Sequence, residues 1–172
     1  MIELLGGIII ISSTTLLGFY YAKGLSERVQ LIREIQYSLA MLESEIIYSS
    51  SPLIEAMQYV AQRSRSPVKE FFFSFSEKLY KKEIDCILDG FMMTVGEFGG
   101  KLKLEKDEID SVGSFLKSLE SSDMEGQKTS FNITMKKLES FEKRSEEIVK
   151  KNEKLYKYLG VCSGLLVVII LI

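Results

Sequence analysis

Apolar side chains recur through the middle of the chain at steps of three, four and seven residues. The first such stripe comprises Leu25, Ile32, Ile35, Leu39, Leu42 and Ile46. Further stripes lie within residues 53–61, 68–79, 84–98, 109–119 and 131–159. This spacing indicates helices with one buried face, and the alternation typical of strands is almost absent. The sequence therefore predicts an all-α fold with a six-helix bundle.

Short turn signals separate the stripes. Ser51-Pro52 is expected to cap and open the second helix, and Ser66-Pro67 repeats the pattern before the third. Gly99-Gly100 is expected to end the fourth helix. Ser122, followed by Glu125 three residues later, fits a capping box that opens the last helix.

The last helix is predicted to be long, with a heptad seam. Its apolar positions include Phe141, Ile148 and Leu155, whereas Ser145 and Asn152 place polar groups in the same seam. A polar seam residue costs stability but can fix register. Because the first and last helices both carry seams and must run antiparallel, we expect them to pack together.

Both ends of the chain are apolar and read as membrane segments. Residues 4–22 carry no charge and would span roughly 28 Å as a helix, close to the thickness of the hydrocarbon core. Residues 158–172 are also free of charge and form a shorter tail. Basic residues follow the first segment and precede the second, which favours a cytoplasmic position for the middle of the chain. We therefore expect membrane helices at 1–22 and 158–172, flanking a cytoplasmic bundle at 23–157.

Small residues offer close-packing faces on both membrane segments. The first segment carries Gly7, Thr14 and Gly18, and the second carries Gly160 and Gly164 in a G-x-x-x-G pattern. The two segments would form a membrane hairpin. Their small-residue faces fit pairing of the two segments with each other or contact with other membrane proteins. The pattern is also compatible with no specific contact, because glycine is common in membrane helices.

Composition argues against catalysis and against nucleic-acid binding. The chain has 22 Lys+Arg and 24 Asp+Glu, so no strongly basic stripe is available for nucleic acid. Histidine is absent, and two cysteines build neither a disulfide framework nor a zinc site. No phosphate-binding loop, nucleophile elbow or zinc-protease motif occurs. We expect no enzymatic activity, no cofactor and no metal.

Three consecutive phenylalanines stand out in the third predicted helix. Phe71, Phe72 and Phe73 cover about 200° of a helix, more than one narrow core face accepts. Either this helix is central in the bundle, or one ring, Phe73 by preference, meets a partner.

Several segments together resemble the stage III sporulation protein AB family of endospore-forming bacteria. They are LLGGIIII at 4–11, TTLLGFY at 14–20, MLESEI at 41–46, SPLIEA at 51–56, Ser122-Asp123 with Gln127, and NEK at 152–154 with YLGV at 158–161. The resemblance covers nearly the whole chain. It departs at Ser49 and Glu120, where the family usually has glycine.

The resemblance implies a non-enzymatic platform. The family is similar to inner-membrane platform proteins of type II secretion and type IV pilus systems, whose cytoplasmic units are six-helix bundles. It belongs to a transenvelope complex between mother cell and forespore, so we expect integral insertion in the mother-cell membrane facing the forespore. Expected partners are a cytoplasmic secretion-type ATPase and other membrane proteins of the sporulation complex. A passive assembly factor and a component of a membrane path stay open as alternatives.

Candidate partner contacts come from the family-like segments. Glu43, Glu45 and Glu55 are suited to basic surfaces, although solvated helix charges explain them as well. Asp123 and Gln127 match the family motif, and helix capping gives Asp123 a structural alternative. Phe73 is the apolar candidate.

Overall fold

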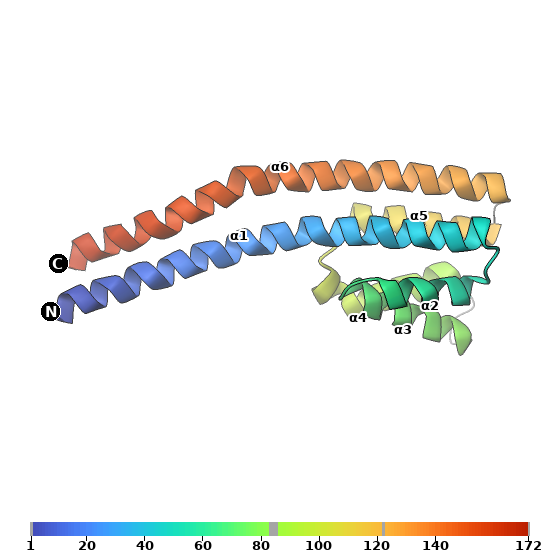
Figure 1. Ribbon diagram of the computed structural model, residues 1–172, viewed down its shortest axis with the longest axis horizontal. Coiled ribbons are helices and arrows are strands. Elements are labelled where there is room, and N and C mark those ends of the chain that lie inside the picture. The colour runs from blue at the N-terminus through green and yellow to red at the C-terminus, as the bar shows by residue number, and fades with distance from the viewer. Residues whose placement is uncertain (1, 83–85, 122, 172) are drawn as a thin grey trace. The chain divides into compact units, whose positions relative to one another are not determined.

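The computed structural model describes residues 2–82, 86–121 and 123–171, although most side chains before residue 23 and after residue 152 lie outside the description. These described residues form six α-helices and one π-helical turn, with no strand among them. The predicted all-α fold is therefore confirmed (Figure 1). The elements are α1 (Ile2–Glu43), η1 (Ser44–Tyr48), α2 (Leu53–Arg63), α3 (Val68–Tyr80), α4 (Ile87–Leu102), α5 (Lys106–Ser121) and α6 (Met124–Leu171).

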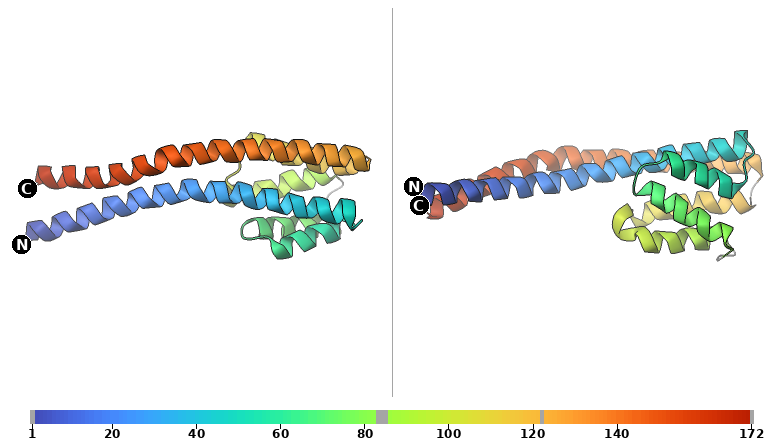
Figure 2. Two further views of the ribbon diagram at one scale, coloured as in Figure 1. Left: turned by 45° about the horizontal axis from the view of Figure 1, so that its top comes forward. Right: turned by 60° about the horizontal axis from the view of Figure 1, so that its bottom comes forward.

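The chain divides into two compact units. One unit comprises Leu31–Glu142, and the other comprises Met1–Gln30 with Lys143–Ile172. In the second unit, the beginning of α1 and the end of α6 lie together (Figures 1 and 2). Among the residues that the structure describes, no helix has a stretch both long and apolar enough to cross a membrane.

Phenylalanine rings connect several helices in the core of the unit Leu31–Glu142, which otherwise consists of aliphatic side chains and Met57. Phe71 makes edge contacts with Phe91 and Phe98, with ring centroids 5.8 and 6.2 Å apart. Phe115 of α5 meets Phe131 of α6 at 5.7 Å. Edge-to-face pairs add to the free energy gained by burying the rings. These contacts join α3 to α4 and α5 to α6.

The triple phenylalanine places two rings inside and one outside. Phe71 and Phe72 are 6% and 4% exposed, whereas Phe73 is 56% exposed. Phe73 therefore lies on the exposed face of α3.

Three predicted helix boundaries are wrong. Before α3, Pro67 takes the N-cap position, so Ser66 does not cap that helix and no side-chain cap forms there. Gly99-Gly100 does not end α4, which continues to Leu102 and ends where Lys103 takes a left-handed φ of 46°. Leu102 is 3% exposed, and its burial offsets the roughly 1 kcal/mol that a glycine costs inside a helix. Ser51 does not cap α2, because its hydroxyl group donates to a carboxylate oxygen of Glu45 at 2.8 Å and Pro52 takes the N-cap position.

Asp123 caps the start of α6. Oδ1 of Asp123 accepts a hydrogen bond from the backbone N–H of Gly126 at 2.9 Å. This satisfies one of the unpaired N–H groups of the first turn. Ser122, the predicted cap, lies outside the described residues.

The predicted seam of α6 holds only in part. Ser145 is 6% exposed, as a seam position requires, but Ile148 and Leu155 are 43% and 53% exposed. A straight α-helix rotates by about 20° per heptad against a seven-residue repeat. The series from half-buried Phe141 to Ile148 and Leu155 therefore turns progressively away from the buried side.

Candidate partner-binding site

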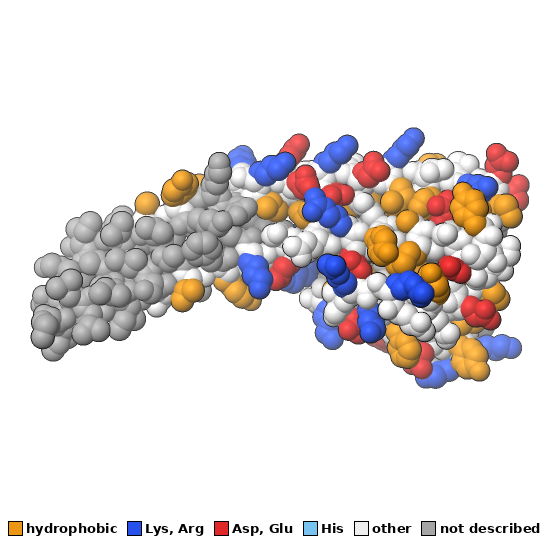
Figure 3. All heavy atoms as spheres, in the orientation of Figure 1, with side chains coloured by type: hydrophobic (Ala, Val, Ile, Leu, Met, Phe, Trp, Pro, Cys, Tyr) orange, Lys and Arg blue, Asp and Glu red, His pale blue; other side chains and the backbone are white. Residues whose placement is uncertain are grey.

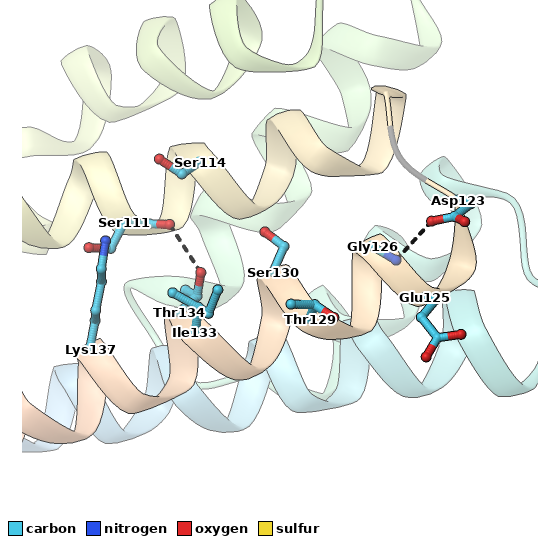
Figure 4. A pocket seen from close by; sticks show the side chains of 10 residues that line it. All are labelled: Ser111, Ser114, Asp123, Glu125, Gly126, Thr129, Ser130, Ile133, Thr134 and Lys137. Atoms are coloured by element: carbon cyan, nitrogen blue, oxygen red, sulfur yellow. Dashed lines mark hydrogen bonds between the residues drawn. The ribbon is translucent and has the colours of Figure 1, made fainter.

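A groove of about 470 Å³ runs between α5 and α6 in the unit Leu31–Glu142 (Figure 4). Hydroxyl side chains line much of it: Ser111, Ser114, Thr129, Ser130 and Thr134. Because these side chains are small, the two helices leave room between them on the outer surface. The groove is therefore a shallow surface channel in which hydroxyl groups and apolar atoms are mixed.

Three of the hydroxyl groups are hydrogen-bonded to backbone carbonyl groups. Ser111 Oγ donates to Asp107 O and Ser114 Oγ donates to Asp110 O, each at 2.7 Å. Thr134 Oγ1 reaches across to Ser111 O at 3.4 Å and joins α6 to α5. Only the Thr134 bond connects the two helices, since both serine bonds lie within α5, and none of the three pairs a hydroxyl group with a general base. The groove suits binding of a polypeptide better than chemistry.

The groove has charges of opposite sign at its two ends. Asp123 and Glu125 stand at the start of α6, and Lys137 stands at the other end (Figure 4). Ile133, which lies between them, is 52% exposed. A partner segment with one apolar residue and opposite charges at its two ends would match this surface.

A second group of polar residues lies where η1 meets the start of α6. The ammonium group of Lys128 stands 5.6 Å from the ring centroid of Tyr48, which is 75% exposed. Half-buried Glu43 precedes the turn. Burial raises the pKa of the Glu43 carboxyl group, and the positive charge of Lys128 opposes this shift.

Two of the predicted partner residues have structural contacts near the same end. Asp123 caps α6 through the N–H of Gly126. Gln127 Nε2 donates to the carbonyl oxygen of Leu119 at 3.3 Å and so ties the first turn of α6 to the end of α5. The structure brings Asp123 to the groove and leaves Gln127 outside its lining.

The remaining predicted contacts are spread over other elements. Glu45 lies in η1 and accepts the Ser51 hydroxyl group, Glu55 is exposed in the first turn of α2, and Phe73 is exposed on α3. The small residues predicted to pack in the membrane, Gly7, Thr14, Gly18, Gly160 and Gly164, fall outside the side chains that the structure describes.

Sequence reasoning did not find the hydroxyl groove. A signal was available in Thr134, which lies three residues after Phe131 and four before Leu138 on the apolar stripe of α6. A polar residue at such a position indicates a buried hydroxyl group that needs a hydrogen-bond partner. Thr134 is 3% exposed, in agreement with this interpretation.

The described side chains offer no metal centre. No group of three or more Cys, Asp or Glu residues within the described ranges is placed to hold a metal ion.

Comparisons with known proteins agree on one family. The family model for stage III sporulation protein AB matches residues 3–172. The stage III sporulation protein AB of Bacillus subtilis (strain 168) is 33% identical over 171 residues, 99% of each chain. A solved structure of a stage III sporulation protein AB has a TM-score of 0.66 and 28% identity, and the match covers 72% of this chain and 97% of that chain. On these grounds the chain belongs to the stage III sporulation protein AB family.

Proposed function

We propose that this protein is a non-enzymatic platform of the transenvelope complex between mother cell and forespore, coupling a cytoplasmic ATPase to membrane partners. The observation that carries the proposal is the family match over residues 3–172, which includes the helical bundle and both apolar ends. The proposed location is the mother-cell membrane facing the forespore, with the bundle in the cytoplasm.

The charge pattern supports integral insertion. Residues 4–22 and 158–172 carry no charge, and lysines flank each segment on the side toward the bundle. Such an arrangement orients membrane helices with the basic side in the cytoplasm. The bundle would then face the ATPase, and the two apolar ends would face membrane partners.

The groove between α5 and α6 is the proposed contact for the ATPase. It combines exposed Ile133 with opposite charges at its ends, a combination that selects both a partner and its orientation. The exposed ring of Phe73 on α3 is the competing surface, and Figure 3 shows further apolar side chains scattered among the charges of the bundle.

Sedimentation of the fragment 23–157 with the ATPase of the sporulation complex tests the proposal. The solved structure of a relative matches 72% of this chain and 97% of its own length, so a shorter chain of this family has been studied by itself. This supports the use of a fragment. The proposal predicts a complex with the unmodified fragment, and Ile133→Asp is expected to weaken it by about tenfold or more, as loss of an interface anchor does. Circular dichroism should show an unchanged helical fold, because Ile133 is half exposed.

Phe73→Asp is the matched control, since Phe73 and Ile133 are exposed to similar extents. If only Phe73→Asp abolishes binding, the contact lies on α3 and the assignment of the groove is wrong. If a folded fragment ignores the ATPase, a passive assembly factor replaces the motor-linked platform. Leu39 is unsuited to this experiment, because it is fully buried and a charge there would unfold the bundle.

A further inference from the structure

One contact sets the register between α1 and α6 in the unit that holds both termini. Nε of Arg28 donates to Oγ of Ser145 at 3.4 Å, and Ser145 is 6% exposed. The two helices run antiparallel, so a step of one residue toward the start of α1 is matched by a step of one residue toward the end of α6. Two residues reached by equal numbers of steps from Arg28 and Ser145 lie at the same height and are called level. The rise per residue is the same in both helices, about 1.5 Å.

The register extends to the ends of both helices. Counted from this contact, Ile2, 26 residues before Arg28, is level with Leu171, 26 residues after Ser145. Figures 1 and 2 show these helix ends together in all views. The pictured proximity of the two ends agrees with the register set by Arg28 and Ser145 in this unit.

The same register staggers the charges of the two helices. Lys23, the first basic residue of α1, is level with Lys150, whereas Lys157, the last basic residue of α6, is level with Leu16. Residues 17–22 of α1 carry no charge, but they lie beside a part of α6 that contains Lys151, Glu153 and Lys154. The layer in which neither helix is charged is therefore shorter than the apolar run of α1 alone.

We propose that the hairpin crosses a hydrocarbon layer only about 20 Å thick, the length of residues 4–16 as a helix. This layer lies between the levels of Glu3 and Lys157. Residues 17–22 then lie in the phospholipid headgroup layer beside the basic segment of α6. The inference rests on the proposed membrane insertion and concerns its depth: the lipid partner is a locally thinned bilayer, not one of the usual thickness of about 30 Å.

A series of single cysteines on one exposed stripe of α1 tests the depth. Ser13, Leu16, Tyr20 and Lys23 follow each other at steps of three and four, and all four are exposed. A cysteine at any of them is not hidden by α6, so only the membrane separates their reactivities. The series uses the full chain with Cys86→Ser and Cys162→Ser, in lipid nanodiscs that leave both bilayer faces open to a charged maleimide.

The proposal predicts that Tyr20→Cys reacts within about threefold of Lys23→Cys, while Ser13→Cys reacts at least about tenfold more slowly because the hydrocarbon core excludes the charged reagent. Leu16→Cys should be intermediate. If Tyr20→Cys is as slow as Ser13→Cys, the layer extends to the first lysine and the inference is overturned.

Failure of membrane insertion itself gives a different result. Ser13→Cys would then react as fast as Lys23→Cys, and no protected position would appear. Native Cys162, which is exposed in the structure and lies level with residue 11 in this register, provides the corresponding control on α6 in a Cys86→Ser chain. If Cys162 is protected from the charged maleimide, the tail is inserted in the membrane. If Cys162 reacts rapidly, insertion of the tail is overturned.

Discussion

Arg33 of α1 and Glu142 of α6 form a close ion pair, with Nε 2.6 Å from Oε1. The second carboxylate oxygen of Glu142 accepts a hydrogen bond from Gln36 Nε2 at 3.0 Å. The Glu142 side chain is only 19% exposed, so the pair is partly shielded from solvent. One carboxylate thus joins two consecutive turns of α1 to α6.

Removing this carboxylate should destabilise the bundle measurably. Glu142→Ala deletes both contacts and is expected to lower the free energy of unfolding by about 1–2 kcal/mol. Urea denaturation of the fragment 23–157 provides the measurement. Glu77→Ala is the control, because Glu77 and Lys81 form an exposed i,i+4 pair at 3.7 Å, worth about 0.5 kcal/mol or less. Equal losses in the two variants would contradict the assigned role of Glu142.

Glu120 provides the cap for a helix other than its own. Its Oε1 accepts the backbone N–H of Ile87 at 2.7 Å at the start of α4, where Cys86 makes no side-chain cap. Glu120→Ala should therefore cost about 0.5–2 kcal/mol of unfolding free energy. Glu120→Gln keeps an acceptor oxygen and should lose less than Glu120→Ala. If glutamine is as harmful as alanine, the charge and not the hydrogen bond is responsible.

Glu43 should make stability depend on pH in the acidic range. Burial raises the pKa of its carboxyl group above the usual 4.5, so the folded protein holds this proton more tightly than the unfolded chain does. The contribution of Glu43 to stability is therefore present below pH 4.5 and is lost as pH rises through the raised pKa. Thermal melts of Glu43→Gln and the unmodified fragment should show a smaller loss over this range in the variant.

Lys128→Met is a second test of the pH dependence that Glu43 causes. The positive charge of Lys128 lowers the Glu43 pKa, so its removal should move the pH-dependent range upward. A profile that stays in place would show that the two groups do not interact.

Apolar periodicity was enough to predict the helices, because each buries one face against a shared core. Leu39, Phe75 and Leu138 all occupy the stripe that the spacing assigned to them, and all are at most 1% exposed. Local turn chemistry was less reliable. Tertiary burial of Leu102 carries α4 through two glycines, and Ser51 bonds to Glu45 instead of capping α2.

The candidate site was harder to predict because it depends on contacts between elements far apart in sequence. The groove exists only when Ser111 and Thr134 face each other across α5 and α6, and neither residue type marks a site by itself. Asp123 was chosen for its motif, and its position beside the groove followed only from the structure. Gln127 illustrates the opposite case, in which a motif residue acquires a structural role through Leu119.

The contact between Tyr48 and Lys128 depends on the number of residues in the π-helical turn Ser44–Tyr48. The hydrogen bond of this turn from Ser49 N to Ser44 O encloses one residue more than an α-helical turn does. Deleting a single residue here would restore the shorter turn and rotate the next residues by about 100°. Tyr48 would then leave Lys128, without any change to either side chain. At this end of the bundle, a change of length is therefore a larger perturbation than a change of residue.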